Sequence, residues 1–435
     1  MTGALQLVMW RSSTLPAYWY KQIRGSKQER AQIEEQVRGI IQEVAQKGDA
    51  ALIEYTEKFD GAKLTPKTLR VTRAEIEEAY MQVDKTQIEA IRLFMERLSE
   101  NEKLRLASEM LQVSRDGVNL RTVLCPIESV GCYVPGGSAA YPSTVIMTVT
   151  PARTARVGRI ALCSPPNKKG RVNPLTLVAA DICGVDEFYK IGGAQAIAAL
   201  AYGTESVEPV KKIVGPGNKY VTTAKNLVSK DVAIDMPAGP SEVLILADET
   251  ADPKLIALDL ISQAEHGIDS VVGLVTTSEN VAAKVLQSLQ EILPTIQRRE
   301  IVCSALKNHG FIILCNTVDE MVRVANVFAP EHAELIIKDT EEVASQLTSV
   351  GIILVGPYSP VPLSDYASGT NHVLPTGCFG HSYSGLTVFD FIRRVNIVEG
   401  SKEGLVKIAR YVKALAEAEG LPNHYKALEA RLKNE

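Results

Sequence analysis

The spacing of apolar residues divides the chain into a helical first part and a longer part in which strands and helices alternate. Between Gln28 and Phe59, apolar residues recur at helical spacing, and a second helical run extends from Thr72 to about Leu106. Thr72 is a predicted N-cap because Glu75 follows three residues later, which is the spacing of a capping box. This first part carries no motif that indicates chemistry.

From about residue 126 onwards, short apolar runs typical of strands alternate with helical segments. This alternation indicates βαβ units and mostly parallel sheets, so the predicted fold class is α/β with two similar lobes. The predicted strands form two sets: residues 129–134, 159–163, 187–191, 212–214 and 232–236, then residues 242–247, 271–276, 311–315, 334–337 and 352–355.

The same patterns predict four segments along the 435 residues. Residues 1–125 are an N-terminal arm and helical segment, and residues 126–238 are a first α/β lobe. Residues 239–378 are a second α/β lobe, and residues 379–435 are a C-terminal tail. The tail shows one helix, from Glu403 to Ala418, followed by a polar end. Since it is too small to fold alone, we expect it to pack on another part, such as a second subunit.

Charge and composition favour a small-molecule partner over nucleic acid or a membrane. The 47 Lys and Arg residues nearly balance the 51 Asp and Glu residues, which gives a net charge of -4 and no basic footprint. No stretch reaches the roughly 20 apolar residues of a membrane span, and the start shows no signal peptide. Seven scattered cysteines without a CxxC pair indicate reduced thiols in a cytoplasmic protein.

Four of the six histidines lie beside other groups that can bind metals or transfer protons. They are His266 in QAEHG, His332 in APEHAE, His372 in SDYASGTNHVLPT and His424 in EGLPNH. Gln263 lies three residues before His266, so both side chains project from one face of the last turn of a predicted helix. That pair can offer an oxygen and a nitrogen to a metal. A surface histidine favoured by the helix dipole is the simpler alternative.

The adjacent Glu331 and His332 follow a proline that should end the preceding helix. Such a pair in a loop is a reasonable acid/base couple, because histidine titrates near neutrality and a carboxylate can deprotonate water. An exposed polar loop is the alternative. Cys132 and Cys378 are the thiols nearest to the motifs, and we predict that neither is a nucleophile.

Three glycine-rich segments, VPGGSAAYPS, IGGAQA and VGPGN, each follow a predicted strand and precede a predicted helix. Backbone amides at such helix starts can receive the phosphates of a nucleotide. The G-x-G-x-x-G fingerprint is absent, however, and glycine-rich turns occur in any α/β protein.

Taken together, these segments resemble the histidinol dehydrogenase family, from about residue 130 to the end of the chain. The resemblance implies two incomplete Rossmann-like lobes related to the aldehyde dehydrogenase architecture, with NAD and one Zn²⁺ per subunit as cofactors. The matching blocks are VGCYVPGGSAAYPSTV, YKIGGAQAIAALAYGTESV, KIVGPGNKYVTTAK, DMPAGPSEVLILAD, LISQAEHGIDS, APEHAEL, SDYASGTNHVLPT, SGLTVFDFIRR and EGLPNHYKALEARL. Ala333 departs from the pattern where a leucine is expected.

The resemblance also implies a reaction. L-Histidinol is oxidised in two NAD-dependent steps through L-histidinaldehyde to L-histidine, the last steps of histidine biosynthesis. His332 occupies the position of the general base, and Glu331 that of the residue that activates water. Four oxygen and nitrogen ligands without a thiolate suit a catalytic zinc that holds the substrate. The implied ligands are Gln263, His266, Asp365 and His424.

The remaining site residues follow from the same resemblance. The positions that match NAD contacts are Tyr133, Gln195 and Asn218. The positions that match substrate contacts, beside His332 and the four zinc ligands, are Ser241, His372 and Glu419. In this family the tail enters the partner subunit of a homodimer, which implies tail exchange here.

Two other functions use part of the same residues. A paralogous zinc and NAD dehydrogenase could oxidise another small polar alcohol, such as a sulfonated diol, but Glu419 is well placed to hold a cationic amino alcohol. A zinc hydrolase using Glu331 explains the ligands but not the glycine-rich turns. A non-catalytic zinc scaffold would predict the loss of some key residues, and none is lost.

Overall fold

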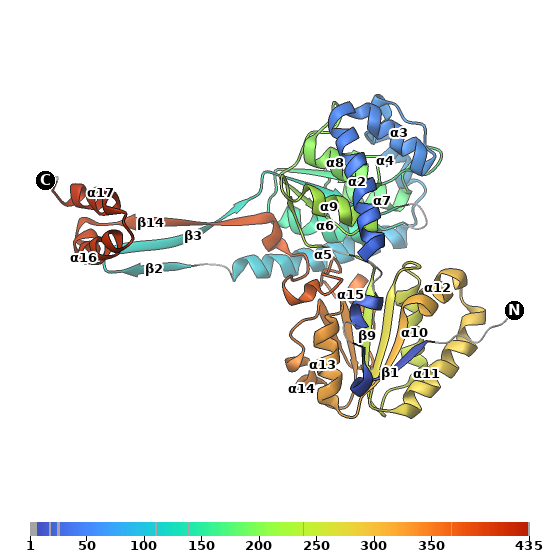
Figure 1. Cartoon of the computed structure of the whole chain (residues 1–435). Coiled ribbons are helices and arrows are strands. Elements are labelled where there is room, and N and C mark those ends of the chain that lie inside the picture. The colour runs from blue at the N-terminus through green and yellow to red at the C-terminus, as the bar shows by residue number, and fades with distance from the viewer. Residues whose placement is uncertain are drawn as a thin grey trace.

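The computed structural model describes residues 7–16, 19–23, 27–108, 111–136, 140–237, 239–366 and 368–433. It has two α/β lobes and an arm that extends from the first lobe (Figure 1). None of the helices within the described ranges is long and apolar enough to cross a membrane.

The first lobe is built on a five-stranded parallel sheet in the order β6-β5-β4-β7-β8. Its strands are β4 (Ser129–Tyr133), β5 (Arg159–Cys163), β6 (Glu187–Tyr189), β7 (Lys212–Val214) and β8 (Ala233–Ile234). One face packs on α4 (Arg73–Tyr80), α5 (Lys85–Ala107), α6 (Pro142–Thr154) and α7 (Pro174–Cys183). The other face packs on α2 (Lys27–Lys47), α3 (Asp49–Asp60), α8 (Gly193–Tyr202) and α9 (Lys219–Val228).

The second lobe has a six-stranded parallel sheet in the order β1-β11-β10-β9-β12-β13. Its strands are β1 (Val8–Arg11), β9 (Glu242–Ala247), β10 (Val271–Thr276), β11 (Gly310–Leu314), β12 (His332–Ile336) and β13 (Ile352–Val355). One face packs on α10 (Pro253–Ala264), α11 (Glu279–Ile292) and α12 (Arg299–His309). The other packs on α1 (Trp19–Ile23), α13 (Val318–Phe328) and α14 (Thr340–Gln346).

Each of the ten predicted strands is present, with ends shifted by at most two residues. The capping box at Thr72 is also confirmed, since its side chain accepts from the Glu75 N–H and Glu75 reaches back to the Thr72 N–H. The first helical run is divided into α2 and α3 at Gly48, whose φ of 55° is favourable only for glycine. The N-terminal β1, which the sequence groups with the helical segment, instead pairs with β11 of the second lobe.

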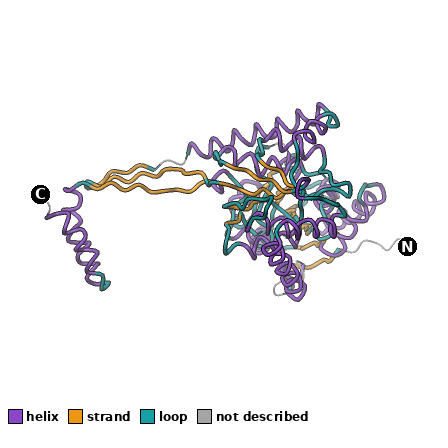
Figure 2. Tube along the Cα trace, turned by 90° about the horizontal axis from the view of Figure 1, so that it is seen from above, coloured by secondary structure: helices purple, strands orange, loops and turns teal. Residues whose placement is uncertain are grey.

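The arm is a three-stranded antiparallel sheet that carries two helices at its end (Figure 2). Strand β3 (Val118–Pro126) lies between β2 (Gln112–Arg115) and β14 (Ile392–Gly400), and α16 (Lys402–Ala418) and α17 (Pro422–Lys433) follow β14. The predicted tail helix is therefore confirmed as α16, and the polar end after it forms a further helix, α17, none of whose residues is buried.

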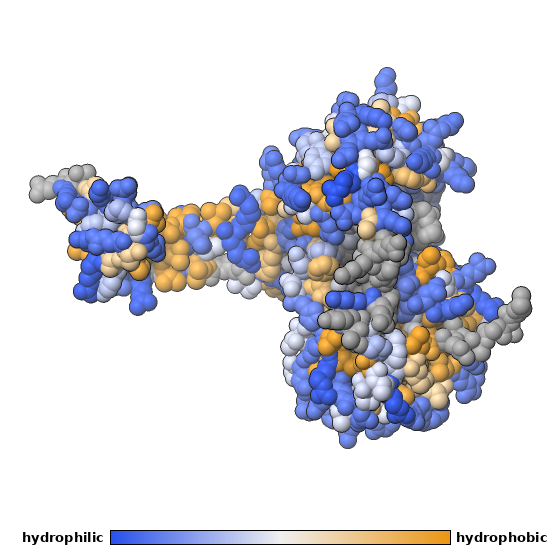
Figure 3. Space-filling model, in the orientation of Figure 1, coloured by the Kyte–Doolittle hydropathy of each residue, from blue (hydrophilic) through white to orange (hydrophobic). Residues whose placement is uncertain are grey.

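The arm exposes large apolar side chains, and much of its surface is hydrophobic (Figure 3). Val398 on β14 is 65% exposed and Leu415 on α16 is 64% exposed. A thin sheet that stands away from the body cannot bury both of its faces, and such exposed apolar surface marks an interaction site.

The aromatic contact between α1 and α13 allows a test of the second lobe. Phe328 is fully buried and its ring stacks on that of Trp19 at 5.6 Å between centroids. We expect Phe328→Ala to lower the free energy of unfolding of this lobe by about 3–5 kcal/mol because it removes a buried aromatic side chain. The measurement is the midpoint of urea unfolding followed by tryptophan fluorescence, since both tryptophans, Trp10 and Trp19, belong to this lobe.

The matched control is Leu104→Ala on α5, where the side chain is 71% exposed and the change should stay within about 0.5 kcal/mol. Equal effects of the two substitutions would contradict the packing of α1 and α13 described above.

Candidate active site

The two lobes together line a cavity of about 1480 Å³. Residues of the first lobe reach it from the carboxyl edge of the sheet, where β4 and β7 are neighbours although β5 and β6 come between them in the chain. Such a switch point is the usual ligand site of an α/β sheet. Ten of the twelve predicted site residues line the cavity: Tyr133, Gln195, Asn218, Ser241, Gln263, His266, Glu331, His332, Asp365 and His372.

His332 is the first residue of β12, so the expectation that it lies in a loop is wrong. The ring is 3% exposed, and its Nδ1 lies 3.2 Å from the carbonyl oxygen of Glu242. Because a carbonyl can only accept, Nδ1 donates this bond, and Nε2 is the basic nitrogen of the neutral ring. Among the described residues Nε2 has no hydrogen-bond partner. In the neutral form of the ring, Nε2 is therefore an unused proton acceptor on the cavity wall.

Glu331 is held beside this ring by the start of β9. Its Oε2 accepts a 2.8 Å hydrogen bond from the Glu242 N–H and lies 3.6 Å from Nδ1 of His332. The Glu242 carboxylate in turn accepts from the Gly377 N–H at 3.2 Å. Sequence reasoning missed Glu242, although a charged residue at the start of an otherwise apolar strand was a usable signal.

The pKa of His332 is raised to about 9. Burial alone lowers it, but the carboxylates of Glu331 and Asp365 and the carbonyl of Glu242 stabilise the charged ring more strongly. Nε2 lies 3.8 Å from Oδ1 of Asp365. The site is therefore a strongly anionic environment that favours a bound cation.

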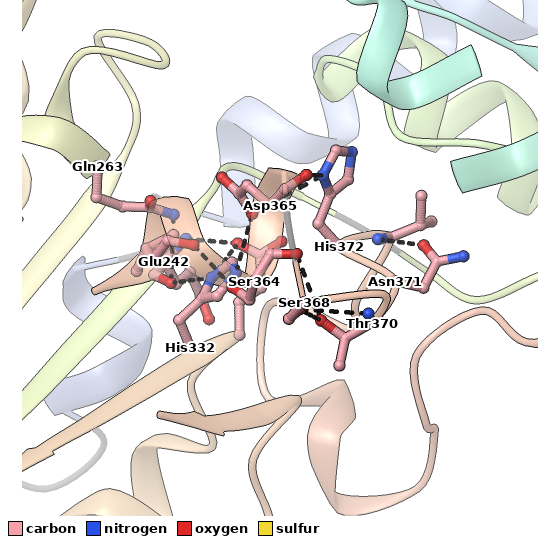
Figure 4. Close-up of polar contacts among 12 residues, drawn as sticks. Glu242, Gln263, His332, Ser364, Asp365, Ser368, Thr370, Asn371 and His372 are labelled. Atoms are coloured by element: carbon pink, nitrogen blue, oxygen red, sulfur yellow. Dashed lines mark hydrogen bonds and ion pairs between the residues drawn. The ribbon is translucent and has the colours of Figure 1, made fainter. Parts of the chain in front are cut away.

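Asp365 lies between His332 and His372 (Figure 4). It is carried by α15 (Val361–Tyr366), whose first N–H donates to Oε1 of the buried Glu334 at 2.8 Å. Nδ1 of His372 lies 3.2 Å from the Asp365 carbonyl oxygen and 3.8 Å from its Oδ1. Burial lowers the pKa of His372, and the Asp365 carboxylate partly opposes this shift. Glu334, which anchors α15, was also missed by sequence reasoning.

Gln263 and His266 both reach the cavity, but not as two positions of one helical turn. Helix α10 ends at Ala264, so His266 lies in the turn beyond it, exposed at the cavity. Gln263 is 1% exposed, and its Nε2 lies 3.5 Å from the Glu242 carbonyl oxygen. Its Oε1 is buried and accepts no hydrogen bond from the described residues.

The residues predicted to contact NAD gather at the carboxyl edge of the first sheet. The Tyr133 hydroxyl, at the end of β4, accepts from the Gly193 N–H at 3.1 Å. The Gln195 amide is buried, and neither of its polar atoms has a partner within the described part of the chain. Asn218 caps α9 by accepting from the backbone of Tyr220 and Val221. Asn218 thus has a structural role whatever it binds.

Glu419 and His424 do not line the cavity of their own chain. Both are exposed, Glu419 at the end of α16 and His424 in α17, at the far end of the arm (Figures 1 and 2). Within the described residues, no three His, Cys, Asp or Glu side chains come together as a metal site. This follows from the predicted ligand set, in which one member is a glutamine and another lies on the arm.

No cysteine is among the described residues that line the cavity. Cys132 is completely buried, and burial raises the pKa of its thiol to about 12. Cys378 is half-buried. The burial and the raised thiol pKa of Cys132 argue against a nucleophile at that position, whereas for Cys378 it stays a prediction.

Comparison with known proteins gives one family. The profile of histidinol dehydrogenase matches residues 23–432. The chain is 48% identical over 399 residues to histidinol dehydrogenase of Methanocaldococcus jannaschii, which covers 91% of each chain. It is 44% identical over 405 residues to that of Clostridium acetobutylicum, covering 93% of this chain and 94% of the relative.

The crystal structure of histidinol dehydrogenase from Elizabethkingia anophelis superposes with a TM-score of 0.91 at 37% identity, covering 100% of this chain and 99% of that one. Fold, profile and identity over nearly the whole length agree. The chain belongs to the histidinol dehydrogenase family, the oxidoreductases that carry out histidinol oxidation in histidine biosynthesis.

Proposed function

We propose that this chain oxidises L-histidinol through L-histidinaldehyde to L-histidine, using two NAD per turnover and one zinc ion per subunit. The observation that carries the proposal is the ring of His332 on the cavity wall, whose buried Nε2 has no hydrogen-bond partner among the described residues and whose Nδ1 lies beside the Glu331 carboxylate. Oxidation of an alcohol to a carboxylic acid requires a base for the hydroxyl proton and a carboxylate that can deprotonate water, and this cavity holds a candidate for each.

The donor set in the second lobe fits a zinc ion. Oε1 of Gln263 is a buried oxygen without a hydrogen-bond donor, and leaving it so costs about 1–3 kcal/mol unless a cation occupies the site. Asp365 supplies a carboxylate and His266 an imidazole on the same cavity. We infer that these three residues and His424 of the partner subunit hold the ion. When bound, zinc supplies the positive charge that orders the amino and imidazole nitrogens of histidinol.

NAD fits the first lobe. The unpartnered amide of Gln195 and the hydroxyl of Tyr133 offer hydrogen bonds at the sheet edge, and Asn218 begins the neighbouring helix. When bound, NAD supplies the hydride acceptor. Ser241 and His372 line the cavity between this edge and the zinc ligands, so we infer that they contact the substrate.

The residues divide the chemistry between them. Nε2 of His332 takes the hydroxyl proton of histidinol as the hydride leaves carbon. Glu331 then deprotonates a water that attacks the aldehyde, and a second hydride leaves to give the carboxylate. His332 must be neutral to act as a base. A cation on Asp365 offsets one of the carboxylates that raise its pKa, so metal and base support each other.

We infer a homodimer in which each tail completes the partner's site. The arm carries Glu419 and His424 away from the cavity of its own chain. Its exposed apolar side chains would be buried by contact with a second chain. Glu419 of the partner subunit then holds the cationic end of the amino alcohol. All seven cysteines are free thiols, which supports a reducing cytoplasmic setting. A paralogous substrate such as a sulfonated diol is not favoured, because the relatives are histidinol dehydrogenases.

The first test is turnover. We expect L-histidinol to yield two NADH per molecule, because both oxidations occur in one cavity. A chelator should abolish the reaction, and added zinc should restore it. The absorbance of NADH, with histidine quantified in parallel, provides the measurement. A protein that binds zinc but forms no NADH from histidinol would contradict the proposed substrate.

The second test separates Glu331 from His332. We expect Glu331→Gln to slow the aldehyde oxidation by about 10²–10⁴-fold while the alcohol oxidation is affected less, because only the second step needs water. His332→Gln should slow the alcohol oxidation by a similar factor, because it removes the base of that step. Single-turnover NADH formation from histidinol and from histidinaldehyde measures each step. The roles assigned above are wrong if Glu331→Gln slows the two steps equally.

The third test concerns tail exchange. Gln263→Ala damages the cavity and His424→Ala damages the tail, so each homodimer should be inactive. A mixed dimer joins the intact cavity of one chain to the intact tail of the other and has one complete site. Random mixing should therefore restore about a quarter of wild-type activity. Unfolding and refolding the two variants together, with each variant refolded alone as the control, tests this. A tail that serves its own chain gives no recovery.

A further inference from the structure

Asp60 has an unexplained position at the edge of the cavity. It is the last residue of α3 and lines the cavity together with Tyr133 and Gln195. Its Oδ2 is buried and receives no hydrogen bond from any residue that the structure describes. Burial raises the pKa of Asp60 to about 6, so the side chain is mostly a carboxylate at neutral pH.

The fold gains nothing from this carboxylate. A negative charge at the end of a helix opposes the helix dipole, and a buried acceptor without a donor costs about 1–3 kcal/mol. Lys58 on the same helix also lines the cavity, but its ammonium group lies over the ring of Phe59, 5.5 Å from the centroid. A residue that costs stability and faces a cavity points to a ligand that supplies the missing donor.

The residues near Asp60 indicate which part of the bound NAD it contacts. Burial raises the pKa of the Tyr133 hydroxyl, and the charge of Asp60 raises it further. Tyr133 and Asp60 line the same cavity, and Tyr133 is one of the residues that the proposed function assigns to NAD. The stacked rings of Tyr55 and Phe59 line the same part of the cavity and offer a flat surface for a base. His332, which must face the nicotinamide, belongs to the other lobe. With the nicotinamide half of NAD at His332, its adenosine half lies on the side of the cavity that Asp60 lines.

We propose that Asp60 accepts hydrogen bonds from the hydroxyls of the adenosine ribose and thereby selects NAD over NADP. A carboxylate suits a vicinal diol, which offers two O–H donors. It repels the 2′-phosphate that NADP carries at the same position. The selectivity thus comes from the end of a helix, in a chain that lacks the glycine fingerprint and its acidic residue after a second strand. This inference rests on the proposed use of NAD.

The experiment is calorimetric titration of the full-length dimeric protein with NAD, NADP and ADP-ribose. We expect the wild type to bind NAD much more tightly than NADP. Asp60→Asn should lower the affinities for NAD and ADP-ribose about tenfold, which is the effect of losing a hydrogen bond to a charged group. The ratio of the NAD affinity to the NADP affinity should also fall by about tenfold or more. Asp60→Ala, measured in parallel, should narrow it similarly.

The matched control is Glu57→Gln, which removes one negative charge from the same helix at an exposed position paired with Lys63. It should leave all affinities unchanged. Nicotinamide mononucleotide lacks the adenosine ribose and should bind the wild type and both Asp60 variants equally.

The outcomes separate the two proposals. If NAD binds but the preference over NADP is the same in Asp60→Asn and Asp60→Ala as in the wild type, the role of Asp60 is overturned and NAD use stands. If the wild type binds neither dinucleotide, both proposals fail.

Discussion

The active site depends on one backbone unit, that of Glu242 at the start of β9. Its N–H holds the Glu331 carboxylate, and its carbonyl oxygen receives Nδ1 of His332 and lies near the Gln263 amide (Figure 4). The proposed base, the proposed water-activating carboxylate and a proposed metal ligand thus all contact the backbone of a single residue. Strand β9 lies within the six-stranded sheet and is buried along its length, so the sheet holds the Glu242 backbone in place. The same contact fixes the tautomer of the neutral His332 ring, in which Nε2 is the nitrogen that can accept a proton.

The two lobes use opposite edges of their sheets. The first lobe offers the carboxyl ends of β4 and β7, as expected for an α/β sheet. The second offers the amino ends of β9 and β12, because Glu242 and His332 are the first residues of their strands. The proposed nucleotide side of the cavity therefore follows the general rule for such folds. The chemical half departs from it and relies on the backbone contacts of Glu242.

Much of the fold was predictable, because buried parallel strands are continuous apolar runs in the sequence. The strands that were missed, such as β2 and β14, mix apolar with polar residues, so they do not appear as continuous apolar runs in the sequence. Ten of the twelve site residues that the resemblance implied line one cavity. Residue spacing alone left the function of each motif ambiguous. Glu242, Glu334 and Asp60 were not found. Asp60 ends a helix, where the sequence alone suggests a surface position. Glu242 and Glu334 are charged residues in mostly apolar strands, which is a usable signal, but only tertiary packing shows what each of them holds in place.

In the proposed dimer, the arm explains why a single chain has an incomplete site. An exposed histidine or glutamate on a surface helix costs little stability, so His424 and Glu419 can be carried on α16 and α17 without local support. The buried oxygen of Gln263 and the acidic surroundings of His332 are costly until a cation is bound. In the proposed dimer, the partner's tail supplies the last ligand for that cation. Assembly and metal binding then stabilise the same group of residues, and a full site exists only where two chains meet.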